Sequence, residues 1–277
     1  MSNNKLKKEA EAFQRVHPKE YLKKYLVKGI RPDGRDFLET RGLRITPASI
    51  STANGSSVVR IGKTIVVCGI KAEIAEPTYD DPDSGFLVPN VEMGPLCSSK
   101  IRPGPPSERP MVYSEVLAKI LHKCQVFNKK SLCIEPGQAV WCLYIDVLCV
   151  SDDGNVIDAA ILAMSNALKN ISLPSAQFDE EAGLIKADRE FMAPLDIKCD
   201  LFPLTFSIIE GGAILADPDT NEEELADGTL TLVMNGSEGT LAYMLKTGKA
   251  SLSLDQLQSC LKVAQGHASV LKEAVSS

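Results

Sequence analysis

The sequence predicts an α+β fold in which antiparallel strands are followed by a helix, an arrangement that occurs twice along the 277 residues. Between residues 40 and 75, apolar and polar side chains alternate, as in an antiparallel sheet that is buried on one face. Short strand patterns return between 204 and 246, and a helical pattern follows them. No convincing sequence repeat accompanies the repeated arrangement.

Residues 140–150 form a nearly unbroken apolar run, rich in β-branched and aromatic side chains, which predicts a strand buried on both faces. A turn at 151–154 leads into a helix predicted at about 156–168, where alanines recur every four positions and allow close packing on a sheet (Ala159, Ala163, Ala167). Strand, turn and helix N-terminus form a potential anion site, because free N–H groups and the helix dipole point toward the turn.

The N-terminal part predicts a charged tail and a short helix. Residues 1–16 are polar and are expected to form a flexible tail. Residues 17–27 predict an amphipathic helix, with one face of apolar and aromatic residues (Tyr21, Leu22, Tyr25, Leu26) and one of lysines. A solvated lysine face is favoured over an RNA-binding patch.

A turn and several strands are expected next. Residues 31–35 read Arg-Pro-Asp-Gly-Arg, a turn in which proline fixes φ and glycine supplies the left-handed position. Its arginines are either structural anchors or ligands, and the sequence alone does not choose. Strands are predicted near 43–49, 57–61 and 64–72, the last two forming a hairpin.

Residues 76–106 are rich in Pro, Gly and Ser with little periodicity, so a long loop is expected before a helix at 107–127. Long loops in compact domains are often functional. Lys100 and Arg102 lie in this loop, and Arg109 lies just beyond it. These three side chains are either ordinary solvent-exposed charges or contacts for a polyanion.

In the second half, strands are predicted near 204–210, 213–216, 229–235 and 240–246. The acidic segment 217–224 offers carboxylates that could hold Mg²⁺. A solvated loop is the favoured interpretation, because consecutive residues rarely converge on one ion without a defined turn. Ser253 and Gln256 form a capping box that predicts the start of a C-terminal helix.

Composition excludes several classes of protein. The net charge of −6 argues against a protein that grips nucleic acid unaided. No apolar run approaches the ~20 residues of a membrane span, and the first residues lack the apolar core of a secretory signal. The eight cysteines and three histidines are dispersed, so no zinc site is expected and the thiols are interpreted as reduced core residues of an intracellular protein. No cofactor or metal is expected.

Several segments together resemble the RNase PH family, and most closely the ring subunits of the eukaryotic RNA exosome. They are 31–35, Val-Pro-Asn-Val at 88–91, Leu-Cys-Ser-Ser at 96–99, Gly-Pro-Pro at 104–106, Asp-Gly-Asn-Val-Ile-Asp-Ala at 153–159, and Asp-Pro at 217–218 ahead of Glu-Glu-Glu at 222–224. The resemblance implies an RNase PH-like fold (ribosomal protein S5 domain 2-like) with a duplicated βαβα-type core, a single domain over 17–277. It also implies a hexameric ring threaded by single-stranded RNA.

Active members of this family cleave RNA with inorganic phosphate, held by a Gly-Thr-Arg or Gly-Ser-Arg element after the Asp-Gly turn. Backbone and hydroxyl donors orient the phosphate and the arginine neutralises it. Here the corresponding positions read Asn155, Val156 and Ile157, which supply neither the hydroxyl nor the arginine. Asp158 adds a negative charge that is expected to repel phosphate.

Active members also carry an acidic residue two positions before a proline that starts a later strand. Relative to Pro203 that position is Leu201. Asp200 lies one residue away, and a shift of one residue on a strand turns the side chain to the opposite face. The resemblance therefore implies that no catalytic residue is present.

The expected function is a non-catalytic structural subunit of the RNA exosome ring, which helps form the channel for single-stranded RNA in 3′-to-5′ processing and degradation, including rRNA processing. Lys100, Arg102 and Arg109 are the expected RNA contacts. The alternative is a phosphorolytic 3′–5′ exoribonuclease with a degenerate site. A standalone RNA-binding module is disfavoured by the acidic charge.

The resemblance also implies partners and a location. The partners would be other RNase PH-like subunits and cap subunits of a hetero-oligomeric ring, single-stranded RNA and an exosome-associated nuclease, with no membrane. The location would be the nucleus, including the nucleolus, and the cytoplasm.

Overall fold

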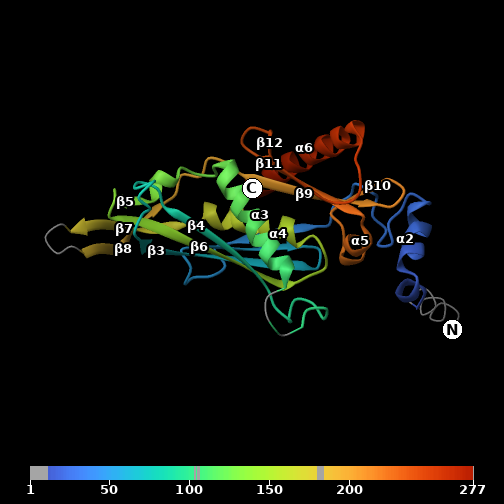
Figure 1. The fold of residues 1–277 in the computed structure, drawn as a ribbon, viewed down its shortest axis with the longest axis horizontal. Helices are drawn as coiled ribbons and strands as arrows, with labels where there is room; N and C mark the ends of the chain where they lie inside the picture. Colours follow the sequence, from blue (N-terminus) through green and yellow to red (C-terminus); the bar gives the residue numbers. More distant parts are fainter. Residues whose placement is uncertain (1–11, 103, 105–106, 180–183, 277) are drawn as a thin grey trace.

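The computed structural model describes residues 12–102, 104, 107–179 and 184–276. Its elements are stacked in layers (Figure 1). A six-stranded sheet is followed by helices α3 (Glu108–Cys124) and α4 (Val156–Lys169), then a four-stranded sheet, then helix α6 (Leu254–Ser276). One buried apolar cluster runs through both sheets and the helices between them.

The first sheet has the order β1-β2-β3-β6-β4, with β5 also paired to β6. Its strands are β1 (Leu43–Pro47), β2 (Gly55–Ile61), β3 (Thr64–Ala75), β4 (Phe86–Met93), β5 (Cys133–Glu135) and β6 (Ala139–Ser151). The predicted antiparallel hairpin is confirmed as β2 and β3. The prediction of a continuous loop over 76–106 was wrong, because β4 lies inside it and pairs in parallel with β6. The sequence pattern of β4 is short and interrupted by Pro89, so it did not indicate a strand. The strand is stabilised by its pairing with β6, which is distant in the sequence.

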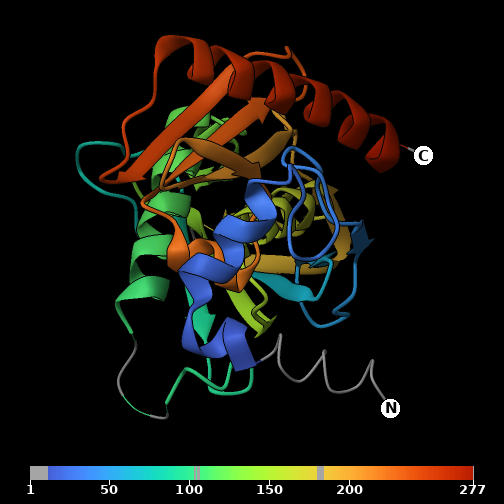
Figure 2. The same ribbon diagram turned by 90° about the vertical axis from the view of Figure 1, so that its right-hand side faces the viewer.

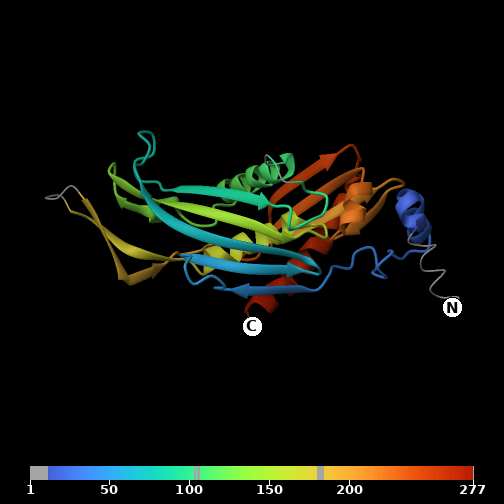
Figure 3. The ribbon, with the colours of Figure 1, turned by 90° about the horizontal axis from the view of Figure 1, so that it is seen from below.

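Helices cover only one face of the first sheet, and the other face is open (Figure 3). Strand β6 is therefore buried on both faces only in its first part. From Tyr144 onward its side chains alternate, and Tyr144, Leu148 and Val150 are exposed by 39%, 45% and 42%. The predicted two-sided burial of the whole run was wrong here, since an apolar run does not reveal whether a second layer covers it.

Helix α4 lies between the two sheets, and every residue from Val156 to Leu168 is buried. The expected close packing is confirmed on β2. The Ser57 hydroxyl donates to the Ala163 carbonyl over 2.8 Å. A Cβ at Gly55 would lie 2.5 Å from the carbonyl oxygen of Ala167, so only glycine fits against this turn of the helix.

A two-stranded hairpin, β7 (Ser172–Asp179) and β8 (Leu184–Pro194), projects from the body at the end opposite the N-terminal helix (Figures 1 and 3). No element was predicted for this segment from the sequence. A short 3₁₀ helix, η1 (Lys129–Leu132), follows α3.

The second sheet is antiparallel in the order β10-β9-β11-β12. Its strands are β9 (Leu201–Ile209), β10 (Ala213–Ala216), β11 (Gly228–Asn235) and β12 (Leu241–Gly248), close to the predicted ranges. The predicted capping box is confirmed, since the Gln256 N–H donates to the Ser253 hydroxyl and the Ser253 N–H to the Gln256 side chain, over 3.2 and 2.9 Å. Helix α6 packs on β9 and β11.

At the N-terminal end, residues 12–16 are helical and helix α2 (Pro18–Leu26) follows. The remainder of the expected tail, 1–11, lies outside the described residues. Helix α2 lies beside α5 (Thr220–Leu225) (Figure 2) and buries Leu22 against Ile209 and Leu215. All eight cysteines are free thiols, buried or half-buried. In the described part of the chain, no helix is long and apolar enough to cross a membrane.

Candidate functional site

The turn between β6 and α4 has the geometry of an anion site. Gly154 and Asn155 both have positive φ, 84° and 55°, and Asn155 is the N-cap residue of α4. Thr64, the first residue of β3, holds the turn in place. Its hydroxyl donates to the Gly154 carbonyl over 2.7 Å and accepts from the Asp153 N–H over 3.1 Å. The backbone N–H of Asn155 lies at the positive end of the helix dipole.

A carboxylate of the same chain occupies this position. Glu223 accepts a hydrogen bond from the Asn155 N–H over 2.7 Å and another from Arg109 over 3.1 Å. Arg109 also donates to Asp152 over 2.8 Å. Burial raises the pKa of Glu223 to about 7, although Arg109 opposes the shift. The side chain of Glu223 thus makes the two contacts, with a helix N-terminus and an arginine, that a bound anion would make.

Glu223 is held there by α5, in a segment that was predicted to be a solvated acidic loop. That prediction was wrong. Asp219 caps α5 and forms a reciprocal capping box with Glu222. The start of α5 packs directly on the turn, because a Cβ at Gly154 would lie 2.4 Å from the carbonyl carbon of Asp219. The segment is ordered because its carboxylates bind donors that come from distant parts of the chain.

Both arginines of the turn at 31–35 are structural anchors of this segment rather than free ligands, and Arg35 donates to the Asp217 carbonyl over 3.0 Å. Arg31 is fully buried and donates to both carboxylate oxygens of Glu222 and to the Ala216 carbonyl, the latter over 2.7 Å. Arg41 makes a bidentate pair with Asp217 over 2.9 and 2.7 Å. Burial alone would raise the pKa of Asp217, but the hydrogen bonds and charge of Arg41 outweigh it and lower that pKa.

Asp158 is buried and directed at β9. It accepts from the Thr205 N–H over 2.8 Å, the Thr205 hydroxyl over 2.7 Å and the Asn155 side-chain amide over 2.8 Å. Burial raises the pKa of Asp158 to about 6, against the opposing effect of these hydrogen bonds. This carboxylate therefore joins α4 to β9, and its charge also contributes to raising the pKa of Glu223, so it opposes an anion at the turn as the sequence predicts.

The residues at the positions that the resemblance implies for catalysis lie in the core. Val156 and Ile157 are 0% and 6% exposed and belong to the apolar cluster. Leu201, the first residue of β9, is 1% exposed. Asp200 does not face the turn, because it forms an ion pair with Lys169 at the far end of α4, over 2.8 Å.

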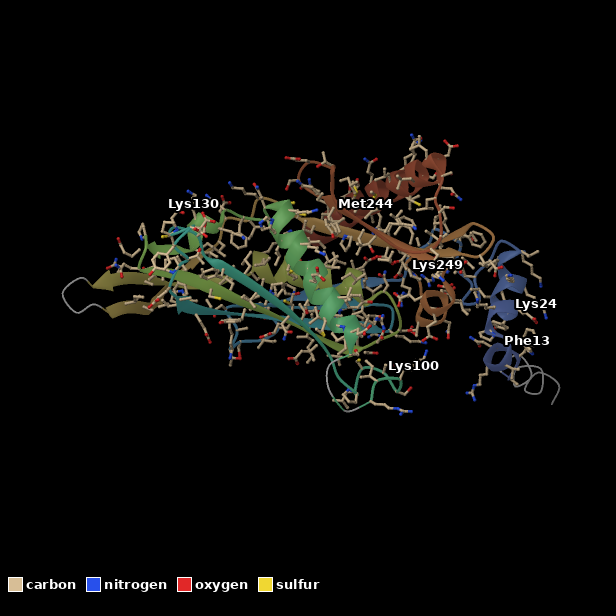
Figure 4. All side chains as sticks on the ribbon, in the orientation of Figure 1. Phe13, Lys24, Lys100, Lys130, Met244 and Lys249 are labelled. Atoms are coloured by element: carbon tan, nitrogen blue, oxygen red, sulfur yellow. The ribbon has the colours of Figure 1, made fainter. Side chains whose placement is uncertain are left out.

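The three expected RNA contacts lie in different environments. Lys100 is on an exposed loop (Figure 4) and pairs with Glu224. Arg102 is exposed near it, and both line a surface cavity of about 710 Å³ at the start of α3. Arg109 is instead held by Asp152, Glu223 and the Tyr113 hydroxyl, with 38% of its side chain exposed.

Sequence reasoning missed Glu223, Arg41 and Asp217 as members of one site. Arg41 lies in the strand region 40–75, and Asp217 and Glu223 lie in the acidic segment 217–224. No local pattern in these segments indicates which arginine pairs with which carboxylate. Across the ranges that the structure describes, no group of three or more His, Cys, Asp or Glu side chains is arranged to hold a metal ion.

Two family models match consecutive parts of the chain. The 3′ exoribonuclease family, domain 1, matches residues 39–174, and domain 2 of the same family matches residues 202–266. The first segment contains the first sheet with α3 and α4, and the second contains the second sheet and most of α6.

Known proteins similar to this chain over nearly its whole length are components of the exosome. The exosome complex component rrp43 of Schizosaccharomyces pombe is 38% identical, covering 91% of this chain and 93% of the relative. The exosome complex component Rrp42 of Methanocella arvoryzae is 35% identical over 92% of this chain and 94% of the relative.

Solved structures agree with the sequence matches. A chain of the Archaeoglobus fulgidus exosome with RNA bound to the active site superposes with a TM-score of 0.81 at 31% identity, covering 93% of this chain and 97% of that one. A chain of an archaeal exosome core gives a TM-score of 0.79 at 28% identity, covering 94% and 96%. With its duplicated sheet-and-helix architecture and both family domains in order, the chain belongs to the 3′ exoribonuclease (RNase PH) family.

Proposed function

We propose that this protein is a non-catalytic structural subunit of an exosome ring. The observation that carries the proposal is the Glu223 carboxylate at the Asn155 N–H, 2.7 Å away, where a phosphate would have to bind. A phosphate there would need to displace a covalently attached carboxylate that α5 positions and Arg109 neutralises. Buried Val156 and Ile157 offer no replacement donor. The same site disfavours the alternative, a phosphorolytic exoribonuclease with a degenerate centre.

The purified chain is expected to show no phosphate-dependent shortening of single-stranded RNA. Val156 and Ile157 supply no hydroxyl or arginine for a phosphate. Loss of one charge-stabilising group typically lowers a catalytic rate by about 10²- to 10³-fold. The measurement is release of nucleoside diphosphates from a 3′-labelled oligonucleotide with inorganic phosphate. Contaminating nuclease is recognised by comparison with a Glu223→Lys variant, because contamination would persist unchanged in that preparation, and Lys119→Gln on the exposed face of α3 is the matched surface variant. Diphosphate release that disappears in a Glu223→Lys variant would contradict the proposal.

The open face of the first sheet supports the ring assignment. Val88, Tyr144, Leu148 and Val150 are each about 40% exposed, and all lie on β4 or β6. An uncovered sheet face with large apolar side chains is suited to a neighbouring subunit. The proposed neighbours are other RNase PH-like subunits, together with cap subunits and an exosome-associated nuclease. Their activity would serve RNA processing and degradation, including rRNA processing, in the nucleus, nucleolus and cytoplasm.

Within such a ring, we infer that Lys100 and Arg102 contact the phosphates of single-stranded RNA, with Arg109 beside them. Replacing Lys100 and Arg102 with glutamine should weaken RNA binding by the assembled complex and lower the log–log salt slope by roughly 0.7 per lost contact. Arg109→Gln is tested separately, because that variant also removes the partner of Glu223. The measurement is fluorescence anisotropy over a range of salt concentrations.

Two outcomes would reject this assignment. If the Lys100→Gln/Arg102→Gln complex binds RNA with the salt slope of the parent, the two residues are ordinary surface charges. If the complex fails to assemble, they are subunit anchors. Lys119→Gln, an exposed lysine on α3, is the matched control and should leave binding unchanged.

A further inference from the structure

The N-terminal helix carries a row of aromatic rings that the hydrophobic core does not need. Phe13, His17, Tyr21 and Tyr25 follow one another at intervals of four residues, with ring centroids 5.6 Å apart for Phe13–His17 and 5.0 Å for Tyr21–Tyr25. Phe13 and Tyr21 also lie 6.4 Å apart. The apolar cluster that docks α2 contains Leu22 and Leu26 but none of these rings. The row is therefore a separate, partly exposed surface, and its first ring, Phe13, is labelled in Figure 4.

Cations flank this row. Between residues 12 and 28 there are five lysines and arginines and a single acidic residue, Glu20, in a chain whose net charge is −6. The ammonium of Lys24 lies 4.1 Å from the centroid of the Phe13 ring. A surface cavity of about 340 Å³ is lined only by aromatic rings and lysines, namely Phe13, Tyr21, Lys24, Tyr25 and Lys28. The solvated lysine face favoured from the sequence is thus interleaved with aromatic side chains.

We propose that this face of the N-terminal helix binds single-stranded RNA, with bases stacked on the Phe13, Tyr21 and Tyr25 rings and phosphates contacted by Lys24 and Lys28. Aromatic rings alternating with cations match the two repeating parts of a single strand, the base faces and the phosphates. A folded protein partner would instead favour a continuous apolar face with a polar rim. The proposal concerns residues 13–28, in and around α2, and does not depend on the absence of phosphorolysis.

The test measures binding of a fluorescent oligouridylate to the full-length chain in its purified complex. Phe13→Leu/Tyr25→Leu removes two stacking rings while keeping apolar, helix-favouring side chains, and should weaken binding about tenfold. Lys19→Gln/Lys24→Gln/Lys28→Gln should lower the log–log salt slope by roughly 0.7 per lost contact. Tyr25→Phe keeps the ring and should bind as the parent does. With 4-thiouridine in the RNA, crosslinks should map to residues 12–28.

The matched control replaces three exposed lysines outside α2, Lys119, Lys246 and Lys262, and should leave affinity and crosslinks unchanged. Unchanged binding in both α2 variants would overturn the proposal. Weakening by the lysine variant alone would also overturn it, because stacking is then not involved. Loss of a protein subunit from either α2 variant, with RNA affinity retained, would identify a protein-docking surface instead.

Discussion

Replacing Arg31 with alanine is expected to lower the free energy of unfolding by about 3–5 kcal/mol, the usual cost of breaking a buried ion pair by removing one partner. Arg31 is 0% exposed and its guanidinium satisfies the Glu222 carboxylate and the Ala216 carbonyl at once. Without it, the buried Glu222 carboxylate keeps only a distant ion pair with Arg35, 3.9 Å away. The measurement is chemical denaturation of the chain within its soluble complex, or hydrogen exchange in α5.

A second variant separates charge from packing. Arg31→Met/Glu222→Gln removes both charges, while the amide oxygen introduced at position 222 can still accept from the Asp219 N–H in the capping box. It should be more stable than Arg31→Ala, since replacing a buried pair costs less than breaking it. The exposed pair Lys23–Glu210, 51% and 63% exposed, is the control, and Lys23→Ala should change stability little. Equal effects at both pairs would show that burial does not determine the contribution of Arg31.

Replacing Asp158 with alanine should destabilise the fold by on the order of 3 kcal/mol, because it leaves buried donors without an acceptor. The Thr205 N–H lies beyond the end of β10 and is bonded to Asp158 over 2.8 Å. In this variant the Thr205 hydroxyl can still bond to the Thr231 hydroxyl, 2.9 Å away. Most of the lost stability is therefore expected to come from the unpaired Thr205 N–H. Urea denaturation measures the difference. A loss below about 1 kcal/mol would mean that the strand finds another partner.

Asp158 also makes stability depend on pH. Because the folded pKa is raised to about 6, its contribution is fully present below the unfolded pKa and is lost as the pH rises through 6. Unfolding free energy should fall by roughly 2 kcal/mol between pH 4 and pH 7 from this group. Glu223, with a pKa raised to about 7, acts in the same direction. Asp217, whose pKa is lowered, acts oppositely and stabilises less as the pH falls.

Asp158→Asn isolates this effect, because the amide does not titrate and one oxygen still accepts from Thr205. The slope of stability against pH should flatten in that variant. The exposed Asp146→Asn should keep the slope of the parent. A parent protein whose stability rises steadily from pH 4 to pH 7 would contradict this assignment, because Asp217 changes its contribution only below the ordinary carboxylate range.

Local patterns in the sequence accounted for much of the fold. The alternation in β2 and β3, the alanine spacing of α4 and the Ser253–Gln256 capping box each depend on neighbours a few residues apart, and all three occur in the structure. Local patterns also placed a potential anion site at the turn before α4. These properties follow from periodicity and residue type, whereas the significance of Val156 and Ile157 came from the resemblance to the family.

What the tertiary structure decided was which surfaces are covered and which charges meet. Strand β6 and the loop before α3 were misjudged because neither the open sheet face nor the pairing of β4 is encoded within either segment. Arg31 meets Glu222 across 191 residues, and the Asn155 N–H meets Glu223 across 68. A sequence shows the charges, but Coulomb energy depends on distance and burial, which the packed chain alone sets. Only the fold could therefore show a carboxylate of this protein at the potential anion site.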